Sequence, residues 1–202
     1  MTAPQAARGK KALHAAERDP ERVQTWRTAC RATLQALDVR RLLFVDASGV
    51  NLAMTRRCGQ ATPGQRVVES VPDNYGSHQT RLAALSLDGL DAPWVVDGAV
   101  NGAIFHCWVS EVLCPTRRPG DSGLGEKLSA HRVSGLAARG ARLLRLSPSS
   151  PDFTPREPCW SKSKTFLRRA KARTVEALID AITEALDTVT TTDIRGWFEH
   201  GG

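Results

Sequence analysis

The sequence lacks any long hydrophobic run. Its longest uninterrupted aliphatic or aromatic stretches, such as residues 42–45, span only four or five residues, whereas a helix that crosses a bilayer needs about 20. Three basic residues near the start (Arg8, Lys10 and Lys11) are followed by no apolar stretch, so we expect no secretory signal. With 41% hydrophobic and 24% charged residues, the 202-residue chain has the composition of one globular domain, or of one domain with a short extension.

Closely paired cysteines are also missing. The number of cysteines is odd, and none of them forms a C-x-x-C pair. This spacing suits neither a zinc site nor a disulfide framework, so we expect reduced thiols, most of them buried. The five residues are Cys30, Cys58, Cys107, Cys114 and Cys159.

Acidic residues are scarce in one part of the chain. Over the whole sequence, 28 Lys and Arg face 21 Asp and Glu, which gives a net charge of +7. Between residues 139 and 173, ten basic residues face only Asp152 and Glu157, so this segment carries +8 and the rest sums to −1. Such a local patch indicates a polyanionic partner, although a solvated helix face has the same composition. The ten are Arg139, Arg142, Arg145, Arg156, Lys162, Lys164, Arg168, Arg169, Lys171 and Arg173.

Hydrophobic spacing and turn residues predict an α/β fold with a mixed sheet. Strands come first and then alternate with helices, which is typical of this class. The expected helices cover residues 20–38, 101–113, 128–138, 157–171 and 175–189. The expected strands cover residues 41–46, 80–87, 93–96 and 142–146, and residues 51–57 and 65–70 are expected to pair as a β-hairpin.

Three acids stand at the ends of these elements. Asp46 closes the first strand, Glu126 follows a glycine-rich stretch, and Glu157 opens a helix. Carboxylates that converge at one edge of a sheet suit a hard divalent cation such as Mg²⁺. Glu157 has a second explanation, because Thr154, Pro155 and Glu157 fit a capping box with Thr154 at the N-cap.

Several ordered segments resemble one family, the bacterial insertion-sequence transposases of the mariner superfamily. The resemblance runs from about residue 42 to the C-terminus. Its segments are Leu-Phe-Val-Asp-Ala-Ser-Gly at 43–49, Met-Thr-Arg-Arg-Cys-Gly at 54–59, Asp-Gly-Ala-Val-Asn-Gly at 97–102, Leu-Ser-Ala-His at 128–131, Ser-Pro-Asp-Phe-Thr-Pro-Arg-Glu at 150–157 and Gly-Trp-Phe-Glu-His at 196–200.

The resemblance implies a fold and an activity. It implies an RNase H-like catalytic domain at residues 39–202, a mixed sheet flanked by helices, preceded by a tail and one helix at residues 1–38. The implied metal ligands are Asp46, Glu126 and Glu157, which would hold two Mg²⁺ or Mn²⁺ ions. The implied activity is the cutting of transposon ends and their joining to target DNA. The family's helix-turn-helix region would precede the first strand. In this sequence only about 40 residues precede the first strand, so we expect the chain to match the catalytic part of the family alone.

The sequence departs from the family around the second acid. Glu126 and Lys127 stand where the family has Asp-Asn, and Ser122, Gly123 and Gly125 replace apolar strand residues. We therefore expect this strand to be weak and Lys127 to repel a metal ion. Asp121 would become the second acid if the strand shifted its register. Ser149, Arg156 and Ser163 also replace a tyrosine and two apolar residues.

The resemblance and the basic patch together predict double-stranded DNA, both transposon ends and target, as the partner. Lys164, Arg168 and Lys171 are spaced by four and three residues and so share one helix face. A homodimer, no membrane contact and a location in the bacterial cytoplasm on the nucleoid are further expectations. The alternative is an inactive remnant that binds DNA non-specifically or regulates an intact transposase. The expected DNA-binding residues are Arg156, Lys162, Lys164, Arg168, Arg169 and Lys171.

Overall fold

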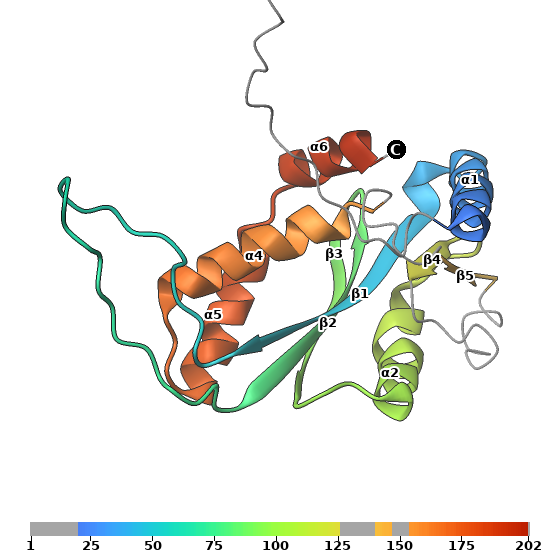
Figure 1. Ribbon diagram of the computed structural model, residues 1–202. Coiled ribbons are helices and arrows are strands. Elements are labelled where there is room, and N and C mark those ends of the chain that lie inside the picture. The colour runs from blue at the N-terminus through green and yellow to red at the C-terminus, as the bar shows by residue number, and fades with distance from the viewer. Residues whose placement is uncertain (1–19, 126–139, 147–153, 202) are drawn as a thin grey trace, which may run out of the picture.

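The computed structural model describes residues 20–125, 140–146 and 154–201 (Figure 1). Several features of the sequence lie outside these residues, namely the N-terminal tail, the expected helix at 128–138, and the residues Glu126, Lys127 and Ser149. In the part that is described, no helix is both long and apolar enough to cross a membrane.

Five strands form one mixed sheet in the order β3-β2-β1-β4-β5. The antiparallel part contains β1, β2 and β3, and the parallel part contains β1, β4 and β5. The expected α/β class with a mixed sheet is confirmed. The strands are β1 (Leu42–Asn51), β2 (His78–Ser86), β3 (Gly89–Asp97), β4 (Ser122–Gly125) and β5 (Arg142–Arg145).

Helices cover both faces of the sheet, and the alternation of side chains along β1 decides which residue meets which helix. Leu43 and Val45 pack with Trp108 on the side of α2 (Gly102–Cys107) and the π-helical turn at Trp108–Leu113. Leu42 and Phe44 pack on the opposite side with α1, α4 and α6 (Figure 1). By the same alternation, Asp46 faces the same side of the sheet as Leu42 and Phe44. The helices on this side are α1 (Glu21–Gln35), α4 (Arg156–Ala170) and α6 (Thr191–Gly201).

The long helices follow the apolar spacing of the sequence. The helix expected at 175–189 is α5 (Val175–Asp187), whose buried stripe of Leu178, Ala181, Ile182 and Ala185 packs against Leu167 of α4. Thr174 caps it by accepting a hydrogen bond from the backbone N–H of Ala177 (3.2 Å). The expected helices at 20–38, 101–113 and 157–171 are confirmed as well. All five cysteines are free, and Cys30, Cys114 and Cys159 are buried, as expected.

Residues 122–125 form a strand in spite of their low strand propensity, and the expectation that this strand is weak stays a prediction. These residues form β4, which is buried along its whole length and pairs in parallel with β1 on one side and β5 on the other. Its backbone is therefore hydrogen-bonded on both sides, and the sheet compensates for the low strand propensity of Ser122, Gly123 and Gly125. Leu124 supplies the one large apolar side chain, in the cluster that contains Phe44.

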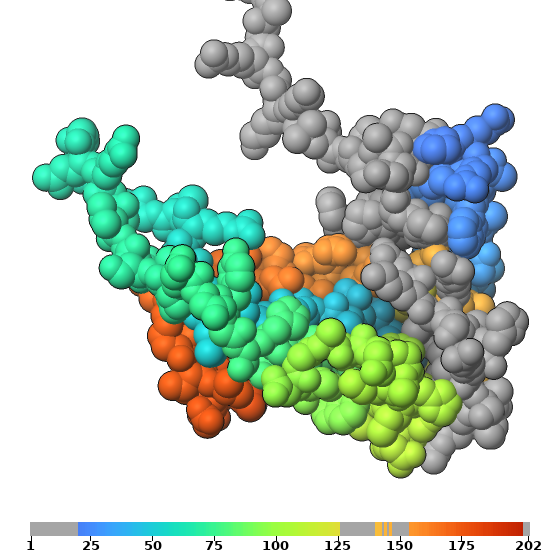
Figure 2. Space-filling view, turned by 60° about the horizontal axis from the view of Figure 1, so that its bottom comes forward, coloured from blue at the N-terminus to red at the C-terminus, as the bar shows by residue number. Residues whose placement is uncertain are grey.

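The expected β-hairpin at 51–70 is wrong. Residues 52–77 connect β1 to β2 without any further strand, and we call this connection the arm. Figure 2 shows the arm standing out from the body of the molecule. Val67, Val68 and Tyr75 are exposed on it. An isolated two-stranded hairpin is marginally stable without a surface to pack on, and the arm has little such surface.

Candidate functional site

Asp46 lies on β1 at the face that α4 covers. Its Oδ2 accepts a hydrogen bond from the indole Nε1 of Trp160 (3.0 Å), and its Oδ1 lies 3.6 Å from Nη1 of Arg156. Both partners come from the first turns of α4. The side chain of Asp46 stays 28% exposed, whereas that of Arg156 is only 4% exposed. The carboxylate of Asp46 is thus held by two side chains of α4 and remains partly exposed to solvent.

A buried arginine supports Trp160 from behind. Arg81 of β2 is 1% exposed, and its Cζ lies 4.8 Å from the ring centroid of Trp160, which is the geometry of a cation–π contact. Its guanidinium donates to Ser163 (2.5 Å) and Ser48 (3.5 Å), while its Nε has no hydrogen-bond partner among the described residues. Burial lowers the pKa of Arg81 to about 10. Ser163, a polar residue at a usually apolar position, therefore has a partner in the core.

Glu157 lies at the N-terminal end of α4, next to Arg156, and is exposed. Burial, followed by Arg81 and Arg168, lowers the pKa of Lys164, and the carboxylates of Glu157 and Asp46 oppose this shift. The charges of both acids thus act on the same lysine. The expected capping box is wrong, because the N-cap of α4 is Pro155 and not Thr154, and the helix begins at Arg156. Thr154 accepts a hydrogen bond from Nε of Arg156 (3.2 Å) instead.

Asp121 does not join this group. The register pairs Leu42 with Ser122 and Phe44 with Leu124, so Asp121 lies at the other end of the β1–β4 pair from Asp46. There it contacts Arg41 (3.5 Å) and Arg117 (3.8 Å). The alternative in which Asp121 becomes the second acid is therefore wrong.

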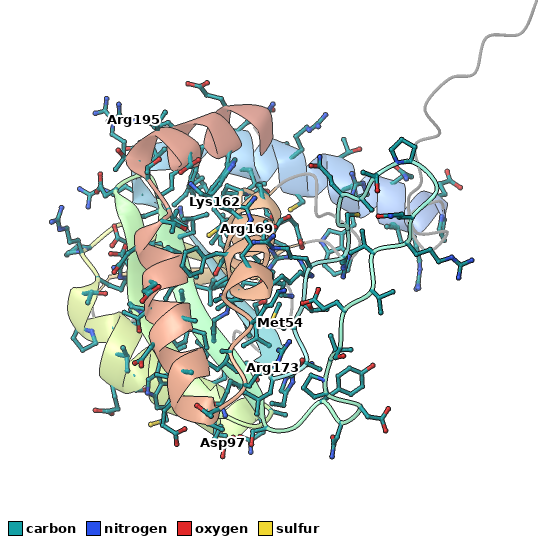
Figure 3. All side chains as sticks on the ribbon, turned by 90° about the vertical axis from the view of Figure 1, so that its left-hand side faces the viewer. Met54, Asp97, Lys162, Arg169, Arg173 and Arg195 are labelled. Atoms are coloured by element: carbon teal, nitrogen blue, oxygen red, sulfur yellow. The ribbon has the colours of Figure 1, made fainter. Side chains whose placement is uncertain are left out.

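The cations of α4 point in several directions. Arg156 is buried beneath Asp46, Lys162 binds Asp193 of α6 (2.5 Å), and Lys171 forms an ion pair with Glu69 of the arm. Figure 3 shows Lys162 and Arg169 on α4, where both border a groove of about 540 Å³ with Trp197 of α6.

Lys164 and Arg168 lie on the side of the acids. Burial and then the nearby guanidinium of Arg57 lower the pKa of Arg168. Arg57 belongs to the arm, so a cation from a distant part of the sequence joins the two on α4. These three residues form a basic strip, and Lys164 is the member that senses the charges of Asp46 and Glu157.

The donor chemistry fits a divalent metal ion. Asp46 and Glu157 offer carboxylate oxygens, and Mg²⁺ commonly binds proteins through one or two carboxylates while phosphates and waters complete its ligands. Among the described residues, no group of three or more His, Cys, Asp or Glu side chains converges to hold a metal. Glu126, the expected third ligand, lies outside those residues.

Sequence patterns did not identify Arg57, Arg81 or Trp160 as parts of this site. All three act through contacts with residues far away in the chain; Asp46 and Trp160, for example, are 114 positions apart. Arg81 sits in a strand where an apolar residue is the norm. A charged residue directly before the apolar run at 82–85 of a predicted strand was the one available signal.

Comparisons with known proteins agree with this architecture. The sequence model of the family described as DDE superfamily endonuclease matches residues 41–179. The crystal structure of the mariner Mos1 paired end complex with Mg has a TM-score of 0.71 at 15% identity, covering 98% of this chain and 65% of that chain. The Mos1 transposase catalytic domain with Raltegravir and Mg has a TM-score of 0.62 at 13% identity, covering 94% of both chains. No curated protein sequence matches.

The chain spans about two thirds of the length of the Mos1 chains in the transposon-end complexes. In the pre-cleavage Mos1 transpososome the match has a TM-score of 0.69 at 14% identity, and it covers 99% of this chain but 64% of that chain. At these identities the similarity concerns the fold. The expected RNase H-like fold is thereby confirmed.

Proposed function

Because this chain belongs to the family of DDE superfamily endonucleases, we propose that it is a transposase catalytic domain that cuts DNA strands and joins them to a target. The observation that carries this proposal is the position of Asp46 on β1 beside the N-terminal end of α4, where Glu157 lies. A central strand and the helix that covers it thus carry one acid each, and the contacts of Asp46 with Arg156 and Trp160 support the proposal that the two acids act together. Glu126, directly after β4, is proposed as the third acid.

In this proposal Asp46, Glu126 and Glu157 hold two Mg²⁺ or Mn²⁺ ions. When bound, such ions activate the attacking oxygen and stabilise the leaving oxygen of a phosphodiester. The residues of the chain orient the ligands. Trp160 fixes Asp46 by donating to Oδ2, and Arg81 holds the indole ring in place.

DNA is the proposed substrate, and the basic strip of Arg57, Lys164 and Arg168 is its proposed contact. Phosphate contacts need positive charge within reach of the backbone; Lys164 lies near the acids, and Arg168 and Arg57 continue the positive charge from there. Arg169 is exposed and adds to this surface. Lys162 and Lys171 are engaged in ion pairs, so their contribution requires those pairs to open. Arg156 is 3% exposed, which favours an internal role.

The proposed assembly is a homodimer that acts on paired transposon ends in the cytoplasm. The exposed apolar residues Val67, Val68 and Tyr75 on the arm support a protein contact there. Recognition of transposon ends is assigned to a region that this chain does not match.

The second candidate is a remnant that binds DNA without cutting it. The observation that favours it is the number of cations around Asp46, where Arg156, Arg81 and Lys164 all disfavour the approach of a metal ion. Basic side chains alone suffice for non-specific DNA binding.

The experiment that separates the two candidates is Mn²⁺-dependent nicking of a supercoiled plasmid. We expect the wild type to nick, and Asp46→Asn to reduce the rate at least about 1,000-fold, because the loss of one carboxylate charge disturbs the metal sites. Asp180→Asn, on the exposed face of α5, is the matched control and should keep full activity. Wild-type protein that binds the plasmid but does not nick it supports the remnant. Nicking that survives Asp46→Asn contradicts the proposed site.

A further inference from the structure

Arg156 occupies an unusual place for a buried cation. It is the first residue of α4, where the helix dipole presents its positive end and favours acidic side chains. The residue is only 3% exposed. A cation so placed depends on partners, because an unpaired buried charge is costly.

Two of the contacts of Arg156 lie at or next to the proposed metal site. Its Nη1 is 3.6 Å from Oδ1 of Asp46, and its Nε donates to Thr154 (3.2 Å). Asp46 is thus approached by a fixed positive charge from the protein side and by solvent from the other side. A metal ion that binds this carboxylate must share it with the guanidinium or displace it.

We propose that Arg156 is a built-in counter-ion that competes with the divalent metal for Asp46. This inference rests on the proposed function, in which Asp46 is a metal ligand. The guanidinium neutralises the carboxylate while the site is free of metal and keeps its orientation together with Trp160. It also lowers metal affinity, since part of the attraction between Asp46 and a divalent ion is already satisfied. Arg156 is a positioning residue rather than a contact to DNA.

The competition predicts a gain of function that a purely structural role does not produce. Replacing Arg156 by an uncharged side chain of similar length should strengthen metal binding, whereas mere damage to the fold should weaken it. The measurement is calorimetric titration of the full chain with MnCl₂, with no DNA present. We expect Arg156→Met to lower the Kd for Mn²⁺ about tenfold, and Asp46→Asn to abolish this gain when the two changes are combined.

Arg142→Met is the matched control. It removes the same charge from an exposed position on β5, where Arg142 donates to Ser122 (3.1 Å). If general net charge were the cause, both variants would bind Mn²⁺ more tightly. An equal gain in Arg142→Met therefore overturns the proposal.

Two further outcomes separate this inference from the proposed function. If Asp46→Asn weakens Mn²⁺ binding by the wild type but Arg156→Met leaves the Kd unchanged or raises it, the competition is refuted and the metal site stands. If neither folded protein binds Mn²⁺ through Asp46, the proposed metal site itself is refuted. Circular dichroism reports folding, and Arg156→Gln replaces Arg156→Met should the methionine variant not fold.

Discussion

The β1–β4 pair carries an aspartate–arginine contact at each end, and the two contacts differ in kind. At one end Asp121 is 10% exposed and is surrounded by Arg41, the backbone N–H of Arg118 (2.9 Å) and Arg117. Arg117 is 8% exposed and also contacts Asp91 (3.3 Å). At the other end Asp46 keeps 28% of its side chain exposed.

The difference separates a structural acid from a functional one. The oxygens of Asp121 face donors of the protein, so this residue fastens the start of β4 to the chain around it. Asp46 has a second acid nearby, an indole that fixes its orientation and an open side. A carboxylate that is oriented but still accessible suits ligand binding, whereas an enclosed one suits stability.

The largest expected effect is on stability. Asp121→Asn should lower the free energy of unfolding by about 3 kcal/mol, because it leaves Arg117 buried with one acid fewer. Asp46→Asn also takes a carboxylate from a buried arginine, Arg156, but the amide can still accept from Trp160 and water reaches the site, so we expect a smaller loss of about 1–2 kcal/mol. Urea unfolding followed by tryptophan fluorescence measures both values. Equal losses in the two variants would break the comparison.

The next effect concerns DNA. Replacing Lys164 and Arg168 by Ala, at the Asp46 end, should flatten the log–log dependence of DNA affinity on salt by about two units. The matched pair Arg40→Ala and Arg118→Ala removes two charges at the Asp121 end and should leave the slope nearly unchanged. Fluorescence anisotropy with a duplex of arbitrary sequence measures both slopes. A slope change in the second pair alone would move the DNA surface to the other end of the sheet.

The smallest effect concerns the support of α4 by α6. The side chains of Lys162 and Thr190 and the backbone N–H of Thr190 lower the pKa of Asp193 to about 2 from its usual 3.8. A carboxyl whose pKa is lower in the folded state stabilises the fold above its unfolded pKa. This contribution should fade as the pH falls from about 3.8 through about 2. Side-chain carboxyl NMR measures the pKa directly, and Lys162→Met should raise it.

The sequence predicted those features that depend on local pattern. The apolar stripe of α5 and the first strand up to Asp46 are visible in residue spacing alone. Strand β4 could not be recognised in this way, because Ser-Gly-Leu-Gly has little strand propensity. The strand is held by hydrogen bonds to neighbouring strands on both sides. Arg156 stood out as one more cation of the basic patch, and only the packing of α4 on β1 shows that it contacts Asp46.

The arm has a consequence for how this chain can be altered. Arg173 anchors its base by donating to the carbonyl oxygens of Leu52 (2.7 Å) and Met54 (3.1 Å), and Figure 3 shows Arg173 beside Met54. β1 and β2 are registered over eight residue pairs without help from the tip. Inserting a tag or a second domain near Gly64 should therefore leave the sheet intact, since doubling the length of a loop costs only about 0.6 kcal/mol of closure entropy. The tip of the arm is a natural point at which to cut, label or circularly permute this domain.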